Sequence, residues 1–507
     1  MAQPHSPVQQ NTSHVLKQGW TMSSVSRIKV MKSLKLLKNT WRLKKSVSAS
    51  TAMSCALLLG FSLPLTASAA NLLEVVDIAL QENLSLNSAE TGLRSSQYDL
   101  DINRGKFLPS LNVSANTNWN DGSTHQTSGS NTDNSYNDHG VNITLSQTLF
   151  NLGDIYSHTN TRIDVDIETL KTEQTRQAII RDASTTYFEY LKSSAQIRAT
   201  QAELNSSISR LKLITRNVEL GNVAGTEKYE VLAQKEGTAN TLRTLKKDQK
   251  VILTQLETIV QRPLNPDYDL QSTIEFTEIP LDRERRLNDI LYSSGYDLLI
   301  AQQQVKKSRQ TLKETGATFV PSLTGSIGYT YDDTNDTSAT VFPDNGVTEE
   351  AVYTLKLDVP LLNGGRDYYR YEQNKVDIER TEIDLQDSKD QSQQQFDEFI
   401  YNINDYSASL VSLKTIIQAN YASYNGIQKA HKLGTRTITD LLSAESKLFS
   451  SIRDYESARY DYIINLVQLN ELIGNLNMNT IGKIAEQMSP VSDRKTDSPI
   501  PLHLLVQ

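Results

Sequence analysis

Two stretches of this chain lack the residues that interrupt helices over an unusual length. Residues 154–220 contain no proline and have glycine only next to their ends, and residues 367–432 contain the single glycine Gly426. As continuous α-helices, each would be about 100 Å long. A compact globular domain has no use for two such helices. The 507-residue chain has 22 glycines and 13 prolines, which argues against many short strands joined by tight turns.

Apolar residues in these stretches recur with a mean spacing of about 3.5, the period of a coiled coil. In the segment 441–473 two seam positions carry charges instead, Glu445 and Arg459. The pattern predicts long helices that pack by knobs-into-holes contacts. The clearest series runs through Phe396, Phe399, Ile403, Tyr406, Leu410, Leu413, Ile417, Tyr421 and Tyr424.

Three landmarks recur at a nearly constant offset, which indicates duplication of one large unit. FLPSL at 107–111 corresponds to FVPSL at 319–323, and LFNLGD at 149–154 to LLNGGR at 361–366, both at an offset of 212. Leu220-Gly221 corresponds to Leu433-Gly434 at an offset of 213. The sequence therefore predicts a first repeat at 70–262, a linker at 263–285, a second repeat at 286–485 and a disordered tail at 486–507.

Each repeat is expected to begin with one helix, at about 71–106 and 286–317. Two stretches of alternating apolar and polar residues follow, for example Val141, Ile143 and Leu145. This period of two predicts strands with one apolar face, and about ten residues suffice for a strand that crosses a bilayer. Polar loops are expected between the strands, at 120–138 and 332–350.

The N-terminal 69 residues are predicted to be an export signal. Residues 1–70 contain nine Lys and Arg and no Asp or Glu. A basic stretch precedes the apolar run 52–65, and Ala67-Ser68-Ala69 fits a cleavage site. Removal of this leader would remove Cys55, the single cysteine. The remainder has 51 − 9 = 42 basic residues against 59 acidic ones, a net charge of −17.

Composition and motifs exclude several classes of function. One cysteine excludes a disulfide scaffold and C-x-x-C sites, and a net acidic chain is a poor nucleic-acid binder. The sequence has no nucleotide-binding loop and no H-E-x-x-H motif. We therefore expect no enzyme, no metal and no cofactor. The histidines expected in the mature chain are scattered, at His125, His139, His158, His431 and His503.

Four strands cannot cross a membrane alone, because an open sheet leaves backbone groups unsatisfied in hydrocarbon. The smallest outer-membrane barrels have about eight strands. A barrel would therefore have to be shared between chains, with 8 strands from two chains or 12 from three. The residue pattern does not choose between these alternatives.

The segments 431–442 (HKLGTRTITDLL) and 455–476 (YESARYDYIINLVQLNELIGNL) resemble the TolC family of outer-membrane channels, which serve tripartite efflux pumps and type I secretion. FLPSL and the duplicated layout extend the resemblance over about 70–485. The resemblance implies a mainly α fold with a small β part. It implies a homotrimer with a 12-strand barrel, four strands per chain, in the lipid of the outer membrane, and an antiparallel coiled-coil tunnel in the periplasm.

The resemblance also implies site residues at the tunnel tip. Arg436 matches an arginine that latches the closed tunnel, and its partners match Thr226 and Glu227. His431 stands where the family often has a tyrosine of the same network. An arginine at a helix end that only satisfies carbonyl groups is the simpler alternative for Arg436.

A constriction ring is implied at Asp440 and Ser443, where the family has two aspartates. Ser443 carries no charge, so three copies would present three aspartates rather than six unless Glu445 compensates. Asp440 is equally interpretable as an acid at a helix N-terminus. The turns around Gly221, Asn222, Gly434 and Thr435 are the expected docking sites for an adaptor.

The leading functional hypothesis is a passive duct that conducts drugs, small molecules or proteins. A periplasmic adaptor and an inner-membrane transporter of RND, ABC or MFS type would supply docking and energy. The alternative is a periplasmic coiled-coil scaffold without a pore. That alternative explains the heptads and the leader, but it leaves the four alternating stretches unexplained.

Overall fold

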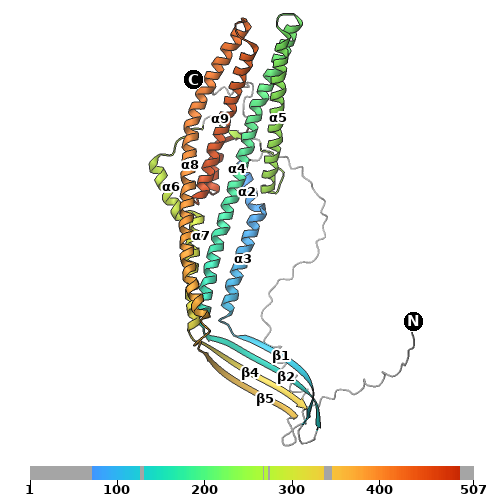
Figure 1. The fold of residues 1–507 in the computed structure, drawn as a ribbon, viewed down its shortest axis with the longest axis vertical. Helices are drawn as coiled ribbons and strands as arrows, with labels where there is room; N and C mark the ends of the chain where they lie inside the picture. The colour runs from blue at the N-terminus through green and yellow to red at the C-terminus, as the bar shows by residue number, and fades with distance from the viewer. Residues whose placement is uncertain (1–70, 126–130, 267, 272–273, 336–344, 491–507) are drawn as a thin grey trace, which may run out of the picture. The chain divides into compact units, whose positions relative to one another are not determined.

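The computed structural model describes residues 71–125, 131–266, 268–271, 274–335 and 345–490. Within these ranges the chain is mainly helical with a small sheet part (Figure 1). The expected leader, 1–69, lies outside the described residues. No helix in the described ranges combines the length and the apolar character that crossing a membrane requires.

The two halves of the chain have the same order of elements. The first half contains α2 (Leu72–Glu82), α3 (Leu84–Gly105), β1 (Ser110–His125), β2 (Asn131–Phe150), α4 (Leu152–Glu219) and α5 (Gly225–Val260). The second half contains α6 (Leu281–Ser294), α7 (Tyr296–Gly316), η1 (Ala317–Phe319), β4 (Ser322–Asn335), β5 (Asn345–Asp358), α8 (Arg366–Lys432) and α9 (Ile438–Leu472). The short elements β3 (Tyr268–Leu270), α10 (Met478–Ala485) and β6 (Met488–Pro490) complete the fold.

The two long helices form as their composition and periodicity predict. α4 has 68 residues and α8 has 67, so each is about 100 Å long. The side chain of Asn151 accepts a hydrogen bond from the Gly153 amide at 2.9 Å and caps the start of α4. The apolar seam of α8 is buried at Phe396, Ile403 and Ile417.

The first helix of each repeat is broken, contrary to the expectation of one continuous helix. The breaks lie at Asn83 and Gly295, where the backbone is extended. The Asn83 side chain accepts from the amide of Ser85 at 2.9 Å and so caps α3. At Gly295 an added Cβ would lie 2.7 Å from the Leu291 carbonyl oxygen, so close packing requires glycine there. The apolar periodicity continues across both breaks, and for this reason it did not predict them.

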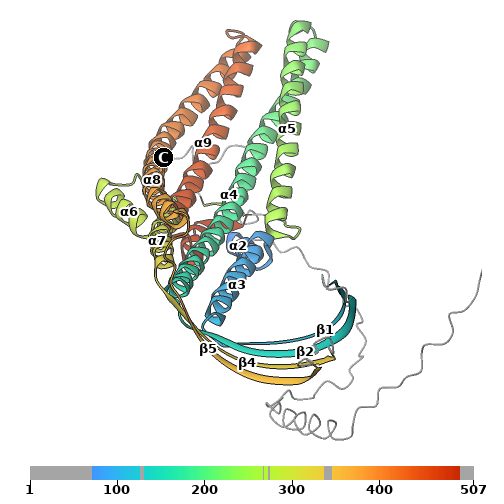
Figure 2. The same cartoon turned by 60° about the horizontal axis from the view of Figure 1, so that its bottom comes forward.

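The four long strands form one antiparallel sheet in the order β1-β2-β4-β5, which curves in the turned view (Figure 2). Its register places apolar residues opposite one another on one face. Val113 pairs with Ile143, Ile143 with Tyr329, and Ile327 with Tyr353. The sheet therefore has one apolar face, as the alternation predicted.

The strands are longer than expected, and the polar loops are correspondingly shorter. β1 and β2 have 16 and 20 residues, and they extend into the expected loop at 120–138. β4 and β5 extend in the same way into 332–350. Polar residues pair here because a strand ladder satisfies the backbone whatever the side chains are. The central residues of both loops, 126–130 and 336–344, lie outside the described residues.

The long helices lie side by side, and the sheet extends from one end of them (Figure 1). α4 packs against α3, α5, α7 and α9, while α8 packs against α7 and α9. Within the described residues the chain thus has two free helical edges, one at α3 and α5 and the other at α8. The largest apolar core lies midway along the helices and includes Tyr187, Phe188, Phe396, Leu291 and Leu472.

The linker and the last described residues form a second, two-stranded sheet, in which β3 pairs with β6. Residues 488–490 are thus structured, which differs from the expected disordered tail, and residues 491–507 lie outside the described residues. α6 also begins at Leu281, before the expected start of the second repeat at 286.

A buried charge holds the small sheet against the helices. The Arg459 side chain is 1% exposed, and its guanidinium donates to Glu456 and to the carbonyl oxygens of Leu270 and Gln271 at 3.1 and 2.9 Å. The charge that interrupts the apolar seam at this position therefore anchors the linker, which periodicity alone could not indicate.

Candidate functional site

The turns that join the long helices lie together at the end of the helices farthest from the sheet (Figure 1). Both have the same backbone geometry. Gly221 and Gly434 have φ values of +72° and +76°. The Asn222 amide donates to the Asn217 carbonyl oxygen at 2.9 Å, and the Thr435 amide donates to that of Ala430 at 3.0 Å. These are Schellman turns.

The four residues expected to dock an adaptor are all exposed: Gly221, Asn222, Gly434 and Thr435.

The helices that follow the two turns begin differently. At the start of α9 the Thr437 side chain accepts from the Asp440 amide at 3.1 Å, and the Thr437 amide donates to the Asp440 carboxylate at 3.1 Å. This is a capping box. Ala224 at the start of α5 provides no side-chain cap. Glu227 occupies the position equivalent to Asp440, and one of its carboxylate oxygens is buried without a hydrogen-bond partner in the described chain.

Arg436 is exposed and its ion-pair partner within the described chain is Asp440. The Nη1 atom of Arg436 lies 3.9 Å from a carboxylate oxygen of Asp440, a loose contact. No hydrogen bond or ion pair in the described residues joins Arg436 to Thr226 or Glu227. His431 is half-buried, and its carbonyl oxygen accepts from the Gly434 amide at 2.9 Å. The structure thus brings the expected latch residues to one end of the chain without bonding them to one another.

Asp440 and Ser443 lie one turn apart on the same side of α9. Asp440 is half-buried and Ser443 is exposed. Hydrogen bonds from the backbone and the side chain of Thr437, together with the charge of Arg436, lower the pKa of Asp440. This carboxylate is therefore ionised at neutral pH, and it is both a helix-start acid and a candidate ring residue.

Glu445 does not join this exposed face. Its side chain is 4% exposed and lies 2.7 Å from the guanidinium of Arg210 on α4. Ser206 also donates to its carboxylate. Burial raises the pKa of Glu445, and Arg210 opposes that shift. The carboxylate of Glu445 is therefore part of the contact between α9 and α4. It does not supply the negative charge that Ser443 lacks.

Two features of the tip were missed by sequence reasoning. The Thr439 hydroxyl on α9 donates to a Glu230 carboxylate oxygen on α5 at 2.8 Å, and no local pattern indicates such a pair. A small apolar core also lies beneath the turns. The continuation of the apolar seams could have identified it, and its buried members are Ile214, Val231, Ile438, Leu441 and Leu442.

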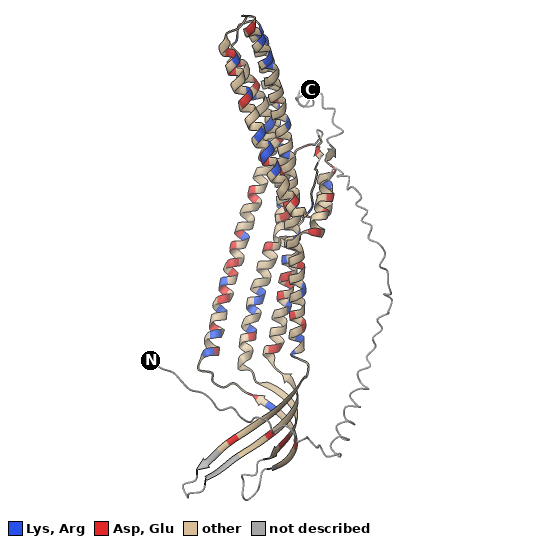
Figure 3. Ribbon diagram, turned by 90° about the vertical axis from the view of Figure 1, so that its right-hand side faces the viewer, with Lys and Arg blue, Asp and Glu red and all other residues tan. Residues whose placement is uncertain are grey.

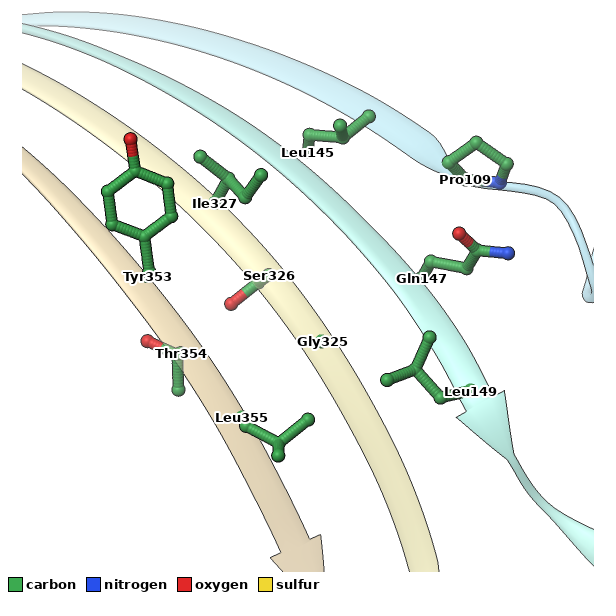
Figure 4. A pocket seen from close by; sticks show the side chains of 10 residues that line it. All are labelled: Pro109, Leu145, Gln147, Leu149, Gly325, Ser326, Ile327, Tyr353, Thr354 and Leu355. Carbon is green, nitrogen blue, oxygen red and sulfur yellow. The ribbon is translucent and has the colours of Figure 1, made fainter.

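Charged residues are distributed along the helices and are sparse on the strands (Figure 3). In the described ranges, no group of three or more His, Cys, Asp or Glu is placed to hold a metal ion. One apolar notch of about 380 Å³ lies on the sheet. Figure 4 shows its lining, in which Gly325 leaves a gap among Leu145, Leu149, Ile327 and Leu355.

The chain is similar to known proteins over most of its described length. The family model described as outer membrane efflux protein matches residues 75–260 and 291–475. Outer membrane protein TolC of Escherichia coli (strain K12) is 22% identical over 435 residues, covering 84% of this chain and 86% of that protein. Alkaline protease secretion protein AprF of Pseudomonas aeruginosa is 25% identical over 468 residues, covering 86% and 92%.

Solved structures share the fold. The CmeC outer membrane channel of Campylobacter jejuni superposes with a TM-score of 0.68 at 17% sequence identity, covering 82% of this chain and 89% of that chain. The open state of the MtrE outer membrane channel of Neisseria gonorrhoeae superposes with a TM-score of 0.63.

Proposed function

Because this chain belongs to the outer membrane efflux protein family, we propose that it is the passive exit duct of a tripartite efflux pump or of a type I secretion system. The protein resides in the outer membrane and extends into the periplasm. Its proposed cargo is drugs, small molecules or proteins, received from an inner-membrane transporter of RND, ABC or MFS type. A relative named for alkaline protease secretion supports protein cargo, and the family description supports efflux.

The observation that carries the proposal is the exposed apolar face of the four-stranded sheet. Leu111, Val113 and Leu355 on this face are 64%, 65% and 68% exposed in the single chain. Contact with lipid would cover these side chains. Among the described strands, β1 and β5 each have one unpaired edge, and such an edge must be paired inside a bilayer. Three copies would close the sheet into the 12-strand barrel that the family resemblance implies.

The free helical edges also support a homotrimer. On α8 the exposed residues Tyr369, Val376 and Ile383 are spaced by seven, and on α3 Tyr98 and Ile102 are 69% and 68% exposed. A spacing of seven is the repeat of a coiled-coil seam. Each edge therefore offers the unpaired half of a seam, which the opposite edge of a second copy would complete.

The internal duplication is supported by equivalent irregularities as well as by the two family matches. α5 is followed by Gln261 with φ +58°, and α9 is followed by Gly474 with φ +72° near the equivalent position. The breaks at Asn83 and Gly295 are separated by the same offset of 212 as the FLPSL landmarks. A duplicated chain would contain two similar helical hairpins, and a trimer would place six such hairpins around the duct.

At the tip we propose that Arg436 latches the closed duct through Thr226 and Glu227. A guanidinium can donate two parallel hydrogen bonds to one carboxylate, and the buried, unpartnered oxygen of Glu227 is an acceptor for such a bond. Asp440 and Ser443 would face the constriction, with three aspartates in a trimer. The exposed Schellman turns would dock the periplasmic adaptor.

The proposal is tested by reconstituting the purified protein in planar lipid bilayers. Discrete ionic conductance is expected, and Arg436→Ser should raise the single-channel conductance by opening the tip. Arg436→Lys should raise it less, because lysine keeps the charge without the bidentate geometry. Absence of any conductance from membrane-inserted protein would contradict the duct, while unchanged conductance in Arg436→Ser would overturn only the latch.

A further inference from the structure

The apolar face of the four-stranded sheet is interrupted near the end that joins the helices. Leu145, Ile327 and Tyr353 lie opposite one another on this face and fill one row across the sheet with large side chains. In the next row toward the helices, Gly325 pairs with Leu355 and contributes no side chain. The missing side chain leaves the notch of about 380 Å³ that Figure 4 shows.

The backbone of β4 does not require a glycine at this position. The φ of Gly325 lies outside the left-handed region. A Cβ added to Gly325 would lie 3.4 Å from a methyl carbon of Leu149, which is an ordinary van der Waals distance. Alanine would therefore fit, even though β2 bulges beside this position, between Thr148 and Phe150. Glycine inside a strand often marks the close approach of a ligand, so the open space itself needs an explanation.

The notch opens on the face that would contact lipid. Most of its lining residues belong to β2, β4 and β5. Further copies that pair with the outer edges of β1 and β5 would add strands beside the sheet, and they would not cover the face at Gly325. Pro109 and Leu149 line the notch close to where β1 and β2 join the helices. In the proposed barrel the notch is therefore at the periplasmic leaflet, where a hydrocarbon chain is the apolar group available to fill it.

A lysine beside the notch is placed to bind a lipid headgroup. Lys106 follows α3 and is exposed, and no carboxylate in the described part of the chain forms an ion pair with it. Its Nζ atom lies 3.4 Å from the hydroxyl oxygen of Ser157. The carbonyl oxygen of the next residue, Phe107, accepts a hydrogen bond at 3.4 Å from the side chain of Gln147, which lines the notch. This contact holds the start of the α3–β1 connection against the notch.

A second lysine near the same end of the sheet is placed differently. Lys356 follows Leu355 on β5, so its side chain lies on the opposite face from the notch. Its Nζ atom lies 2.8 Å from a carboxylate oxygen of Asp358. Lys356 therefore has a partner within the chain and provides a control for Lys106.

We propose that the notch holds one acyl chain of an anionic phospholipid from the periplasmic leaflet, and that Lys106 binds the phosphate of the same lipid. The inference rests on the proposed function, because it needs the apolar face to lie in the bilayer. Leucine and isoleucine side chains around Gly325 would contact the chain, and the ammonium group would supply the charge preference. A zwitterionic lipid offers the same chain, but its own cation partly neutralises its phosphate, so Lys106 attracts it less.

A tryptophan placed at the wall of the notch reports which lipid lies there. Tyr353 is 77% exposed, so Tyr353→Trp replaces one exposed aromatic ring by another. Trp20 and Trp41 lie in the expected leader, so adding Trp119→Phe leaves the mature chain with this single tryptophan. The protein is reconstituted in vesicles made of equal parts phosphatidylglycerol and phosphatidylcholine. Bromine, which quenches tryptophan fluorescence, is carried on the acyl chains of one lipid or of the other.

Quenching should show that phosphatidylglycerol occupies the notch with an affinity about fivefold higher than phosphatidylcholine, the preference that one lysine provides at an anionic surface. Lys106→Gln and Gly325→Leu, which fills the notch, should each abolish this preference. Lys356→Gln should preserve it. Gly328→Leu is the matched control for the notch, because Gly328 lies on β4 with its open side on the opposite face, where the nearest atom to an added Cβ is 3.9 Å away.

Equal quenching by the two lipids in the starting protein would overturn the inference. A preference that survives Gly325→Leu would show that the notch does not hold the chain, and one that survives Lys106→Gln would exclude the lysine as the phosphate ligand. For Gly325→Leu protein that fails to insert, Gly325→Ala replaces it and should lower the preference, and an unchanged preference would overturn the notch. Conducting protein without a lipid preference would leave the proposed function intact, whereas protein that never inserts into vesicles would contradict that function.

Discussion

The guanidinium of Arg210 lies 2.7 Å from the carboxylate of Glu445 in a contact where both side chains are at least nine-tenths buried. Tyr424 of α8 accepts a further hydrogen bond from Arg210 at 3.1 Å. The pair thus lies where three of the long helices meet, between the apolar core below the turns and the next core around Ile417 and Leu448.

Breaking this pair by one substitution should destabilise the protein more than replacing both partners. Arg210→Met leaves Glu445 buried without its cation, at a cost of about 3–5 kcal/mol. Arg210→Met/Glu445→Leu removes both charges and should recover most of that loss. Chemical unfolding in detergent, monitored by circular dichroism, measures the difference. Equal destabilisation by the single and double variants would show that the pair is not coupled.

Stability should depend on pH through Glu445. Burial raises the pKa of Glu445 in the folded state above the ordinary value of 4.5. At pH values between the ordinary and the raised pKa, the folded protein therefore holds a proton that the unfolded chain has released. Its contribution to stability is therefore present below pH 4.5 and is lost as pH rises through the raised pKa. In the Glu445→Gln variant, the melting temperature should fall less steeply as pH rises above 4.5 than it does in the unchanged protein.

Asp440 provides a control in which the pKa shift has the opposite direction, because its pKa is lowered from 3.8. Its contribution should be present above pH 3.8 and lost as pH falls through the lowered value. Asp440→Asn should therefore alter the dependence of melting temperature on pH only at acidic pH, where Asp440 becomes protonated. A change above pH 4.5 in this variant would contradict the assignment.

Adding a second acid to the proposed ring should increase cation selectivity. Ser443→Asp would place a carboxylate one turn from Asp440, giving six in a trimer. The reversal potential across a KCl gradient should move toward the potassium equilibrium value. Ser443→Asn, which adds similar volume without charge, should leave it unchanged.

Substitution of the second turn's glycine, whose backbone conformation is left-handed, should destabilise the protein. Gly434 has φ +76°, so Gly434→Ala is expected to cost about 1 kcal/mol. Gly426 lies inside α8, where an added Cβ would meet nothing within 4 Å. Gly426→Ala should stabilise the helix by about 0.5–1 kcal/mol. Melting temperatures that shift in the same direction would contradict this assignment.

The two faces of the sheet should differ in their tolerance of charge. Val113 lies on the apolar face and Ser114, the next residue of β1, on the other. Val113→Arg should reduce the yield of membrane-inserted protein, because arginine on the lipid face of a barrel strand is destabilising by up to about 2–4 kcal/mol, depending on its depth in the bilayer. Ser114→Arg should insert normally. Equal yields would show that the apolar face does not contact lipid.

The long helices and the apolar face of the sheet were predictable because both rest on simple periods. The spacing near 3.5 and the absence of proline predicted α4 and α8, and alternation predicted which strand residues share a face. Asp440 was interpretable from the sequence as an acid at a helix N-terminus, and the structure places it in a capping box with Thr437.

Features that depend on distant partners could not be predicted. Asn83 and Gly295 interrupt helices whose apolar pattern continues, since the cause is a cap and a close backbone contact. The partner of Glu445 lies on α4, 235 positions earlier in the numbering of the chain, and no local pattern identifies it. The pairing of β3 with β6 joins three-residue segments too short to carry a period.

That last pairing sets the order in which the protein can assemble. β3 lies between the repeats, and its partner β6 is the final element described. α4 likewise needs α9 from the second half to pair its buried Arg210 with Glu445. An exported chain passes its N-terminal half through the inner membrane first, so that half must wait in the periplasm with its seam uncovered. Folding of each chain can therefore be completed only after residues 488–490 are available to pair with β3.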